Sequence, residues 1–319
     1  MVGRLPLEQL IIVRIYVRQY DILNPIYITF CPTNMNLKQF DNLGLDIQGK
    51  VVRHDGRRIQ TYSIGSGENI ILCLPPFPHS GIIYSLFMLK NVNPNTRLLT
   101  FDIPGWIGHS ESNHGMERDP IEEMTEIAES VLSEYGIREF NLLGYSFGGA
   151  VAIHLANKDK NRIKRIALVS TIVNSDLTKG SKDSKRFNII EKTKLHFFMK
   201  YYLKYRFSLY YKPLMNTGVP EEFLKMYKDM INTVSTKYVF ESLKELFLGD
   251  RREELRNIAD ISMLIVNSKN ETGYFRKQAG CIRHILGDEK SIYMEGNHED
   301  FLLYPNGETV KQVIRFLRQ

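Results

Sequence analysis

The chain has 319 residues and a formal net charge of +6, and 43% of its residues are hydrophobic and 24% charged. This is the composition of a globular protein, which excludes a disordered or collagen-like chain, and the length allows one large α/β domain or two small ones. Acidic residues interleave with the basic ones and no DNA- or RNA-binding motif is present. We therefore expect no nucleic-acid partner, although a weak attraction to anionic surfaces is compatible with the charge.

The cysteines indicate the redox environment. Cys31, Cys73 and Cys281 are odd in number, far apart and without CxxC spacing. Such a pattern argues against a disulfide framework or a structural zinc site, and it favours a reducing compartment. We expect a cytoplasmic protein.

Residues 1–46 are interpreted as an appended N-terminal segment without an assigned structure. Its most apolar stretch, Leu10–Val17, contains Arg14 and is much shorter than the roughly 20 residues that span a bilayer, so no transmembrane segment is expected. A small-residue signal-peptide cleavage site is also missing. Met35 is a candidate start of the chain, because regular patterning begins only after it.

From Ile47 onward the sequence predicts short strands. The stretch VVRHDGRRIQTYSIG reads as two strands with a turn at Asp55-Gly56, which is a strong hairpin signal. Near-continuous apolar strands are typical of a parallel sheet that is covered on both faces. Six apolar runs bounded by turn residues follow this pattern: Ile70–Leu74, Leu98–Phe101, Phe140–Leu143, Ile166–Val169, Met263–Val266 and Ser291–Met294.

Helical patterns alternate with these strands. In the clearest one, Asp119 is the predicted N-cap, Pro120 occupies the first helical position, Glu122 stands at the capping-box position, and Gly136 ends the helix. The last segment, from Pro305 to the end, predicts a helix with one apolar face formed by Val310, Val313, Ile314 and Leu317. Alternating strands and helices predict a mostly parallel, doubly wound α/β sheet, with its core in residues 47–170 and 256–319.

Residues 171–255 interrupt the alternation. They are rich in Lys, Tyr, Phe and Met and show helical patterns with aromatic residues on more than one face. We interpret them as a helical cap inserted into the sheet domain. Two hypotheses stay open: a lid over a functional site, or a purely structural subdomain.

A serine surrounded by glycines lies where a strand gives way to a helix. Residues 144–148 read Gly-Tyr-Ser-Phe-Gly, a G-x-S-x-G motif between a predicted strand and a predicted helix. Glycines two residues before and after Ser146 remove side chains that would clash as the chain reverses. The turn is expected to hold the Ser146 hydroxyl at the carboxyl edge of the sheet, where α/β proteins place their sites.

With these motifs the sequence resembles the α/β-hydrolase family over roughly residues 47–319. The resemblance also includes LPPFPHSG, FDIPGWIGHS, LIVNSKNE and GNHEDFLLYP. It implies an α/β-hydrolase fold with a cap after the sixth main strand. Haloalkane dehalogenases and epoxide hydrolases of this family have Asp at the position of Ser146, so those two branches are not expected here.

A serine nucleophile needs a base that a carboxylate orients. His298 follows the last predicted strand, and Ser, then acid, then His is the chain order that this fold produces. It also matches the catalytic His of the family. The acid is predicted at Glu271, which aligns with the acid of the family, and Asp176, which follows the Ile166–Val169 strand, is the alternative. Asp260 and Asp288 precede their strands and should lie at the opposite edge.

The oxyanion hole requires two backbone N–H groups. One is expected from Phe147, the residue after the nucleophile. The other is expected from Phe77, because it is the only residue of Pro75-Pro76-Phe77-Pro78 with an N–H. Relatives often carry His-Gly where this chain has Pro75-Pro76. The two prolines stiffen the loop, and this departure makes ordinary ester hydrolysis less expected.

The sequence therefore predicts a serine hydrolase without cofactor or metal, in which Ser146, His298 and Glu271 act on a carbonyl substrate with an apolar portion. An ester, a thioester or a carbon–carbon bond next to a ketone would fit. Alternatives are a cofactor-free lyase or perhydrolase on the same triad, or a receptor-like protein with very slow turnover. Neither the substrate nor the oligomeric state is predicted.

Overall fold

The structure is a computed structural model that describes residues 47–82, 95–108, 110–111, 119–174, 176, 201, 204–205, 228, 231, 234–271, 273–296, 298, 301 and 307–319. The chain divides into two compact units, Met1–Cys31 and Pro32–Gln319. The predicted N-terminal segment 1–46, with the candidate start Met35, and most of the predicted cap 171–255 lie outside the described residues. The fold described here is that of the second unit.

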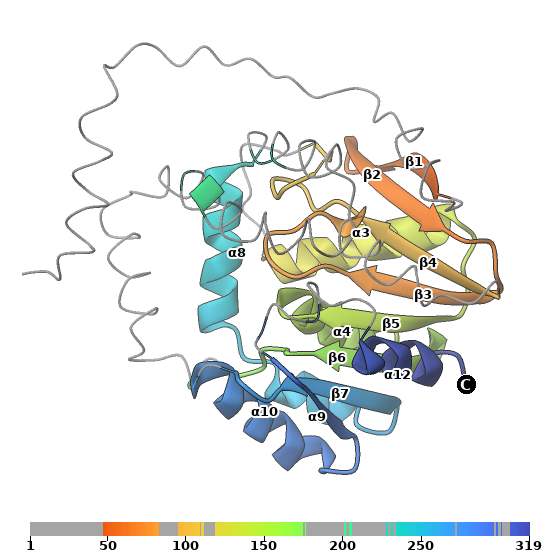
Figure 1. Ribbon diagram of the computed structural model, residues 1–319. Helices are drawn as coiled ribbons and strands as arrows, with labels where there is room; N and C mark the ends of the chain where they lie inside the picture. Colours follow the sequence, from red (N-terminus) through yellow and green to blue (C-terminus); the bar gives the residue numbers. More distant parts are fainter. Residues whose placement is uncertain are drawn as a thin grey trace, which may run out of the picture. The chain divides into compact units, whose positions relative to one another are not determined.

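Within the described residues, eight strands form one sheet in the order β1-β2-β4-β3-β5-β6-β7-β8 (Figure 1). β1 pairs antiparallel with β2, and β2 pairs antiparallel with β4, while the other neighbouring strands pair in parallel. The predicted, mostly parallel α/β sheet is therefore confirmed. The strands are β1 (Ile47–His54), β2 (Arg57–Ile64), β3 (Asn69–Leu74), β4 (Thr96–Phe101), β5 (Phe140–Tyr145), β6 (Ile163–Val169), β7 (Ser262–Ser268) and β8 (Ser291–Met294).

All six predicted apolar runs lie in strands, and several strands extend beyond the predicted run. β6 is an example: it begins at Ile163, three residues before the predicted start, and Lys164 within this addition is exposed. A hydrophobic pattern finds only the part of a strand that is buried on both faces. Lys164 and Arg165 near the start of β6 interrupt the apolar pattern, although Arg165 pairs with Ser262 in the sheet.

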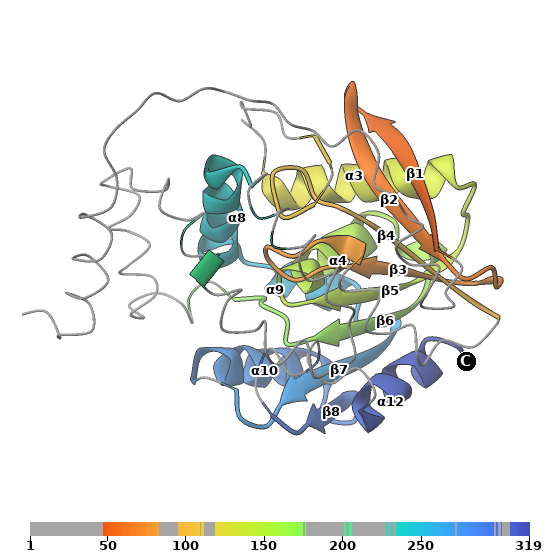
Figure 2. The same cartoon turned by 45° about the horizontal axis from the view of Figure 1, so that its top comes forward.

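Helices cover both faces of the sheet (Figure 1, Figure 2). α3, α4 and α9 lie on one face, and α12 lies on the opposite face, where it buries the four apolar residues predicted for it. The helices are α3 (Pro120–Glu134), α4 (Phe147–Lys158), α8 (Thr236–Leu248), α9 (Arg252–Asn257), α10 (Gly273–Leu286) and α12 (Glu308–Phe316), with a 3₁₀ turn η2 (Lys160–Arg162). Within the described residues, none of these helices has the length and apolar character that a membrane crossing requires.

The ends of α3 follow the predicted capping pattern. The Asp119 side chain accepts a hydrogen bond of 2.8 Å from the backbone N–H of Ile121, and the chain leaves the helix at Gly136 with φ of +66°. A left-handed residue at this position is the usual C-terminal stop of a helix. In a capping box the Glu122 carboxylate would bind the backbone N–H of Asp119. It pairs instead with His154 of α4.

The β1–β2 hairpin turns at Asp55 and Gly56, as predicted, and both residues have positive φ, 48° and 75°. Positive φ at both central residues is the geometry of a two-residue hairpin turn that matches the twist of the strands. Side chains alternate along β1, so Val52 and His54 are buried while Arg53 is exposed. This alternation directs His54 toward the helical layer.

A fully buried carboxylate, Asp102, holds the loop after β3. It accepts hydrogen bonds from the Tyr62 hydroxyl at 2.7 Å, the Ser80 hydroxyl at 2.7 Å and the Gly81 N–H at 3.1 Å. Burial, and next to it the Asp102 charge, raises the pKa of Tyr62 well above its usual range, so Tyr62 stays a neutral donor. Asp102 thereby anchors the far end of the loop that contains Phe77.

α8 is the part of the predicted cap that the structure describes most fully. It lies on the side at which β3, β5 and β6 end (Figure 1). The Ser242 hydroxyl of α8 accepts a hydrogen bond of 3.0 Å from the Trp106 indole. The Tyr238 hydroxyl donates to the buried Glu123 carboxylate at 3.0 Å, and Arg57 pairs with the other oxygen of that carboxylate. Buried polar contacts thus fix α8 to the sheet domain.

Candidate active site

Ser146 lies in the turn between β5 and α4, the strand–turn–helix context that its motif requires. Its φ is +53° and its ψ is −113°, so a non-glycine residue has a backbone conformation that side chains disfavour. Such strain persists only where the surroundings determine it. The Ser146 N–H donates to Val169 O at 2.8 Å, which ties the turn to the end of β6.

The neighbouring glycines are required by close packing. A Cβ atom on Gly144 would lie 2.6 Å from the backbone of Gly148 and Gly149. A Cβ atom on Gly148 would collide with Leu74 O, and one on Gly149 with the Thr171 hydroxyl. Separations this short do not occur for real side chains. The three glycines therefore allow α4 to begin directly against the ends of β3 and β6.

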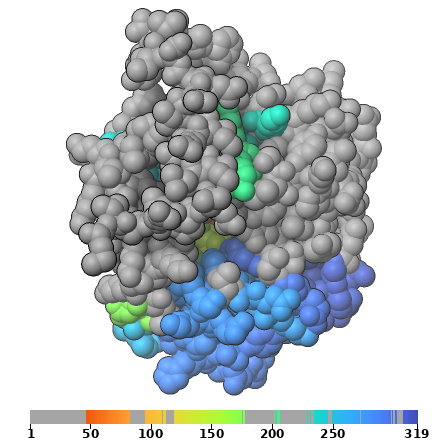
Figure 3. Space-filling model, turned by 60° about the vertical axis from the view of Figure 1, so that its left-hand side comes forward, coloured from red at the N-terminus to blue at the C-terminus, as the bar shows by residue number. Residues whose placement is uncertain are grey.

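His298, which follows β8, lies against the serine. Its Nε2 atom is 3.1 Å from Ser146 Oγ, within hydrogen-bond distance. The ring of Phe275 in α10 stacks on the imidazole with a centroid distance of 3.9 Å and an interplanar angle of 26°. The Tyr145 hydroxyl donates a hydrogen bond to the His298 carbonyl. Both contacts restrict the position of the imidazole. In Figure 3 the blue surface belongs to the C-terminal part of the chain, which includes α10.

Glu271, which follows β7, lies on the other side of the imidazole. Its side chain is 3% exposed, and its Oε1 atom is 3.5 Å from His298 Nδ1. The Ser170 hydroxyl donates to the same Oε1 at 2.6 Å. Among the described residues, His298 Nδ1 and Glu271 Oε2 are both buried without a hydrogen-bond partner. Nδ1 can donate a hydrogen bond and Oε2 can accept one, so a small rotation of the carboxylate would pair these two atoms.

The alternative acid, Asp176, has different surroundings. Its carboxylate accepts a hydrogen bond of 3.0 Å from Arg252 in α9, and its side chain is 49% exposed. The structure brings Ser146, His298 and Glu271 together and places Asp176 in a surface ion pair with Arg252.

The residues predicted to donate to an oxyanion lie on neighbouring elements. Phe147 is the first residue of α4, a position whose N–H has no partner within the helix. Phe77 lies in the loop after β3. Its ring packs edge-on against Trp106 with centroids 5.2 Å apart, and Trp106 packs in the same way against Phe147 at 5.2 Å. This aromatic cluster of Phe77, Trp106 and Phe147 holds the two segments together beside Ser146.

The other histidines have separate positions. His154 is half-buried between Glu122 and Glu254, His54 is buried at the end of β1, and His284 is exposed on α10. The His79 N–H donates to Pro76 O at 2.8 Å within the loop after β3. His109, His114 and His196 lie outside the described residues. Among the described residues, His54, Asp55 and Glu126 form a group whose side chains could hold a metal ion. This group does not include Ser146, His298 or Glu271.

Sequence reasoning missed three residues that contact the site. Ser170 binds the Glu271 carboxylate, Tyr145 binds the backbone of His298, and Phe275 stacks on its ring. Ser170 directly follows β6 and therefore lies at the same sheet edge as Ser146. Its position after a predicted strand could have identified it as a site residue from the sequence. Tyr145 and Phe275 carried none, because the direction of a side chain past a strand end depends on the tertiary packing.

Comparison with known proteins gives this site a family context. A sequence profile described as the alpha/beta hydrolase fold matches residues 69–296. The chain is also similar to the dihydrolipoyllysine-residue acetyltransferase component of the acetoin cleaving system of Pseudomonas putida, with 24% identity over 213 residues. The aligned region is 64% of this chain and 52% of that protein, so the chain spans about half the length of this relative.

Solved structures share the fold. An esterase from Exiguobacterium antarcticum superposes with a TM-score of 0.64 at 17% identity, covering 85% of this chain and 100% of the esterase. A haloalkane dehalogenase from Agrobacterium tumefaciens C58 gives a TM-score of 0.65 at 13% identity, covering 86% and 97%. At these identities the likeness is one of fold. Because enzymes of two different chemistries resemble the chain equally well, its reaction has to be argued from its own side chains.

Proposed function

The chain belongs to the α/β-hydrolase fold family, and we propose that it is a serine hydrolase acting on a carbonyl substrate with an apolar portion. The observation that carries this proposal is the line of contacts from Ser146 Oγ to His298 Nε2 at 3.1 Å and from His298 Nδ1 to Glu271 Oε1 at 3.5 Å. A nucleophile, a base and an orienting acid in one line are what acyl transfer by a serine needs.

His298 is the general base of the first step. Its Nε2 accepts the hydroxyl proton as Ser146 Oγ forms a bond to the carbonyl carbon, and the π electrons of the carbonyl move to its oxygen. When the tetrahedral intermediate collapses, the bond to the leaving group breaks and the same proton passes from His298 to that group. Water then repeats the sequence on the acyl-enzyme and releases the acid and Ser146.

Glu271 orients and stabilises the imidazolium that forms in each half of the reaction. With its carboxylate at Nδ1, His298 keeps the tautomer in which Nε2 is free to accept a proton. Hydrogen bonds of this kind are often long in a free enzyme and shorten when substrate binds. The Ser170 hydroxyl, 2.6 Å from Oε1, fixes one carboxylate oxygen and leaves the other to rotate toward Nδ1. Ser170 is thus a positioning residue.

The backbone N–H groups of Phe77 and Phe147 are the proposed oxyanion donors. A donor of this type contributes about 3–4 kcal/mol to transition-state stabilisation. Phe147 begins α4, where the helix dipole also favours negative charge. The substitution of Pro75-Pro76 for the His-Gly of relatives leaves Phe77 as the donor in that loop, because proline has no N–H.

The apolar portion of the substrate is inferred from the surroundings of Ser146. The aromatic cluster adjoins the nucleophile, and Trp106 and Phe147 are almost fully buried. An acyl or alkyl group would lose less solvation there than a charged group. An ester, a thioester or a carbon–carbon bond next to a ketone all present the carbonyl that the site requires.

The test is hydrolysis of a series of p-nitrophenyl acyl esters of increasing chain length by the full chain. We expect kcat/KM to rise from acetyl to longer acyl groups, and Ser146→Ala to lose the activity. His284→Gln, which changes an exposed histidine of α10, is the matched control and should keep it. A burst of one equivalent of product followed by near-zero turnover would favour a binding or receptor-like function. Equal rates for wild type and Ser146→Ala would contradict the proposal.

A further inference from the structure

The side chain of His54 is buried against α3 and has one nitrogen without a hydrogen-bond partner among the described residues. His54 is the last residue of β1, and its side chain is only 8% exposed. The atom without a partner is Nε2. A buried polar atom of this kind costs free energy unless something binds it, so it requires an explanation.

The other nitrogen determines the tautomer. The Ser130 hydroxyl donates its proton to the Glu126 carbonyl at 3.0 Å within α3. The same hydroxyl lies 2.9 Å from His54 Nδ1, and when it donates to the Glu126 carbonyl it can accept a proton from Nδ1. This arrangement favours the tautomer with the proton on Nδ1. In the neutral imidazole, Nε2 is then the nitrogen with the free lone pair.

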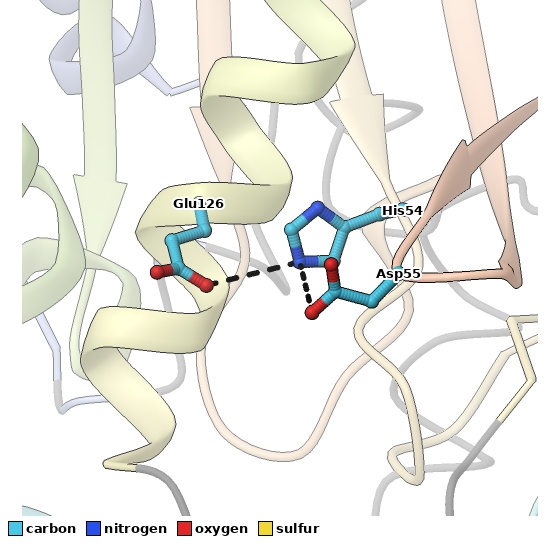
Figure 4. Close-up of side chains that lie close together, drawn as sticks. All are labelled: His54, Asp55 and Glu126. Atoms are coloured by element: carbon cyan, nitrogen blue, oxygen red, sulfur yellow. Dashed lines mark ion pairs between the residues drawn. The ribbon is translucent and has the colours of Figure 1, made fainter.

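Two carboxylates face this lone pair. Asp55 Oδ2 is 3.8 Å and Glu126 Oε2 is 3.9 Å from His54 Nε2, and Figure 4 shows both side chains directed at the ring. A cation between the three groups would be attracted by both carboxylates and would bind Nε2.

We propose that His54, Asp55 and Glu126 bind a divalent transition-metal ion. Bonds of about 2.0–2.2 Å from such an ion to nitrogen and oxygen bridge gaps of about 4 Å, which direct hydrogen bonds do not. The three ligand atoms lie within 4.8 Å of one another, so a small inward movement of the carboxylates completes the set. The Asp55 and Glu126 side chains are 51% and 32% exposed, which gives the ion a path of entry.

The donor set indicates the class of ion. One imidazole with two carboxylates suits Zn²⁺ and its first-row neighbours rather than Ca²⁺ or Mg²⁺, which prefer oxygen ligands alone. Ser130 supplies the outer contact that metal-binding histidines commonly make through their second nitrogen. The sequence offered no motif for this site, because Glu126 is separated from His54 by more than seventy residues and belongs to another element.

The ion would fasten the turn of the β1–β2 hairpin to α3. β1 is the edge strand of the sheet, and Lys50 and Glu134 already form an ion pair between the same two elements. A ligand that binds only the folded state stabilises it in proportion to its free concentration. The site is therefore a structural clamp, and its occupancy is expected to change stability rather than the chemistry at Ser146.

The experiment uses chelator-treated full chain titrated with Zn²⁺ alone, followed by calorimetry and by the thermal unfolding temperature. We expect one equivalent to bind and to raise that temperature. Glu126→Gln and His54→Gln should abolish this binding, and Ser130→Ala should weaken it by about 10–100-fold. Glu126→Gln alters a partly exposed side chain, so it keeps the test valid even if His54→Gln fails to fold.

The control is His154→Gln. His154 also lies between two carboxylates, but both its nitrogens are within 2.8 Å of a carboxylate oxygen, so no ion is expected there. His154→Gln should bind Zn²⁺ as the wild type does. The proposal is overturned if wild type binds no Zn²⁺ at 100 μM, or if Glu126→Gln binds it as tightly as wild type. None of these readouts depends on hydrolase activity.

Discussion

Two histidines, each beside carboxylates, differ in what they can do. His298 at the carboxyl edge of the sheet has one nitrogen on a serine hydroxyl and the other near a single carboxylate, Glu271. His154 in the helical layer has Nδ1 2.8 Å from Glu254 and Nε2 2.6 Å from Glu122. The pKa of His154 is raised, chiefly by its hydrogen bond to Glu254. Burial acts in the opposite direction and lowers it.

The difference shows that partners, rather than residue types, set the role of a histidine. A histidine with a carboxylate on each nitrogen is stabilised as the imidazolium, so it is a poor acceptor of a further proton. A histidine whose Nε2 contacts a hydroxyl can accept that proton and return it. The four predictions below test this contrast, and they run from the largest expected effect to the smallest.

Removing the nucleophile should have the largest effect. Ser146→Ala leaves His298 with nothing to deprotonate, and kcat for any ester that wild type accepts should fall by about 10⁴–10⁶-fold. The small side chain keeps the fold of the turn, which circular dichroism would verify. A variant that retains more than a tenth of the wild-type rate would contradict the assignment of Ser146 as the nucleophile.

Neutralising the acid should come next. Glu271→Gln removes the charge that stabilises the imidazolium, and kcat should fall by about 10²–10⁴-fold with little change in KM, since the loss falls on the transition state. Asp176→Asn is the matched control and should have a mild effect, because Asp176 pairs with Arg252 at the surface. If Asp176→Asn is the crippled variant, the acid follows β6 and our assignment is wrong.

The hydroxyl that holds the acid should have a moderate effect. Ser170→Ala removes the donor to Glu271 Oε1, and we expect kcat to fall by about 10–150-fold, the equivalent of one hydrogen bond to a charged group. Ser170 has φ of +44°, so Ser170→Gly removes the hydroxyl while it relaxes the backbone. Both variants should be equally slow. A fast Ser170→Gly beside a slow Ser170→Ala would show that backbone conformation, not the hydroxyl, matters.

His154→Gln should leave kcat almost unchanged and alter stability in a pH-dependent way. Because the folded-state pKa of His154 is raised, its contribution is fully present below the unfolded pKa of about 6.5 and is lost as pH rises through the raised value. The melting temperature of the variant should therefore fall below that of wild type by about 2–6 °C near pH 6 and by less near pH 9. A deficit that grows with pH would contradict this sign, and a large loss of kcat would mean that His154 serves the site.

The sequence predicts much of this molecule because local rules and burial agree there. The hairpin follows from Asp55-Gly56, the ends of α3 from Asp119 and Gly136, and the parallel sheet from its buried apolar runs. Ser146 was locatable because a motif and its strand-to-helix context coincide. Chain order, sheet direction and the resemblance to the family together led to the prediction of His298 and Glu271 at the same edge.

The remaining features depend on contacts between distant segments. Asp102 binds Tyr62 and Ser80, and the Glu123 carboxylate binds both Arg57 and Tyr238. None of these pairs has a fixed spacing that a pattern could detect. The predicted cap is a mixed case: α8 is helical and fixed to the sheet domain, whereas most of residues 171–255 lie outside the described residues.

The central claim is that Ser146 is an activated nucleophile, and covalent labelling tests it most directly. Wild type and Ser146→Ala would be treated with a fluorophosphonate probe, which reacts with activated serines, and compared by intact mass and peptide mapping. We expect wild type to gain one probe mass on the peptide that contains Ser146 and Ser146→Ala to gain none. Equal labelling of the two proteins, or labelling of wild type at a different residue, would contradict the account.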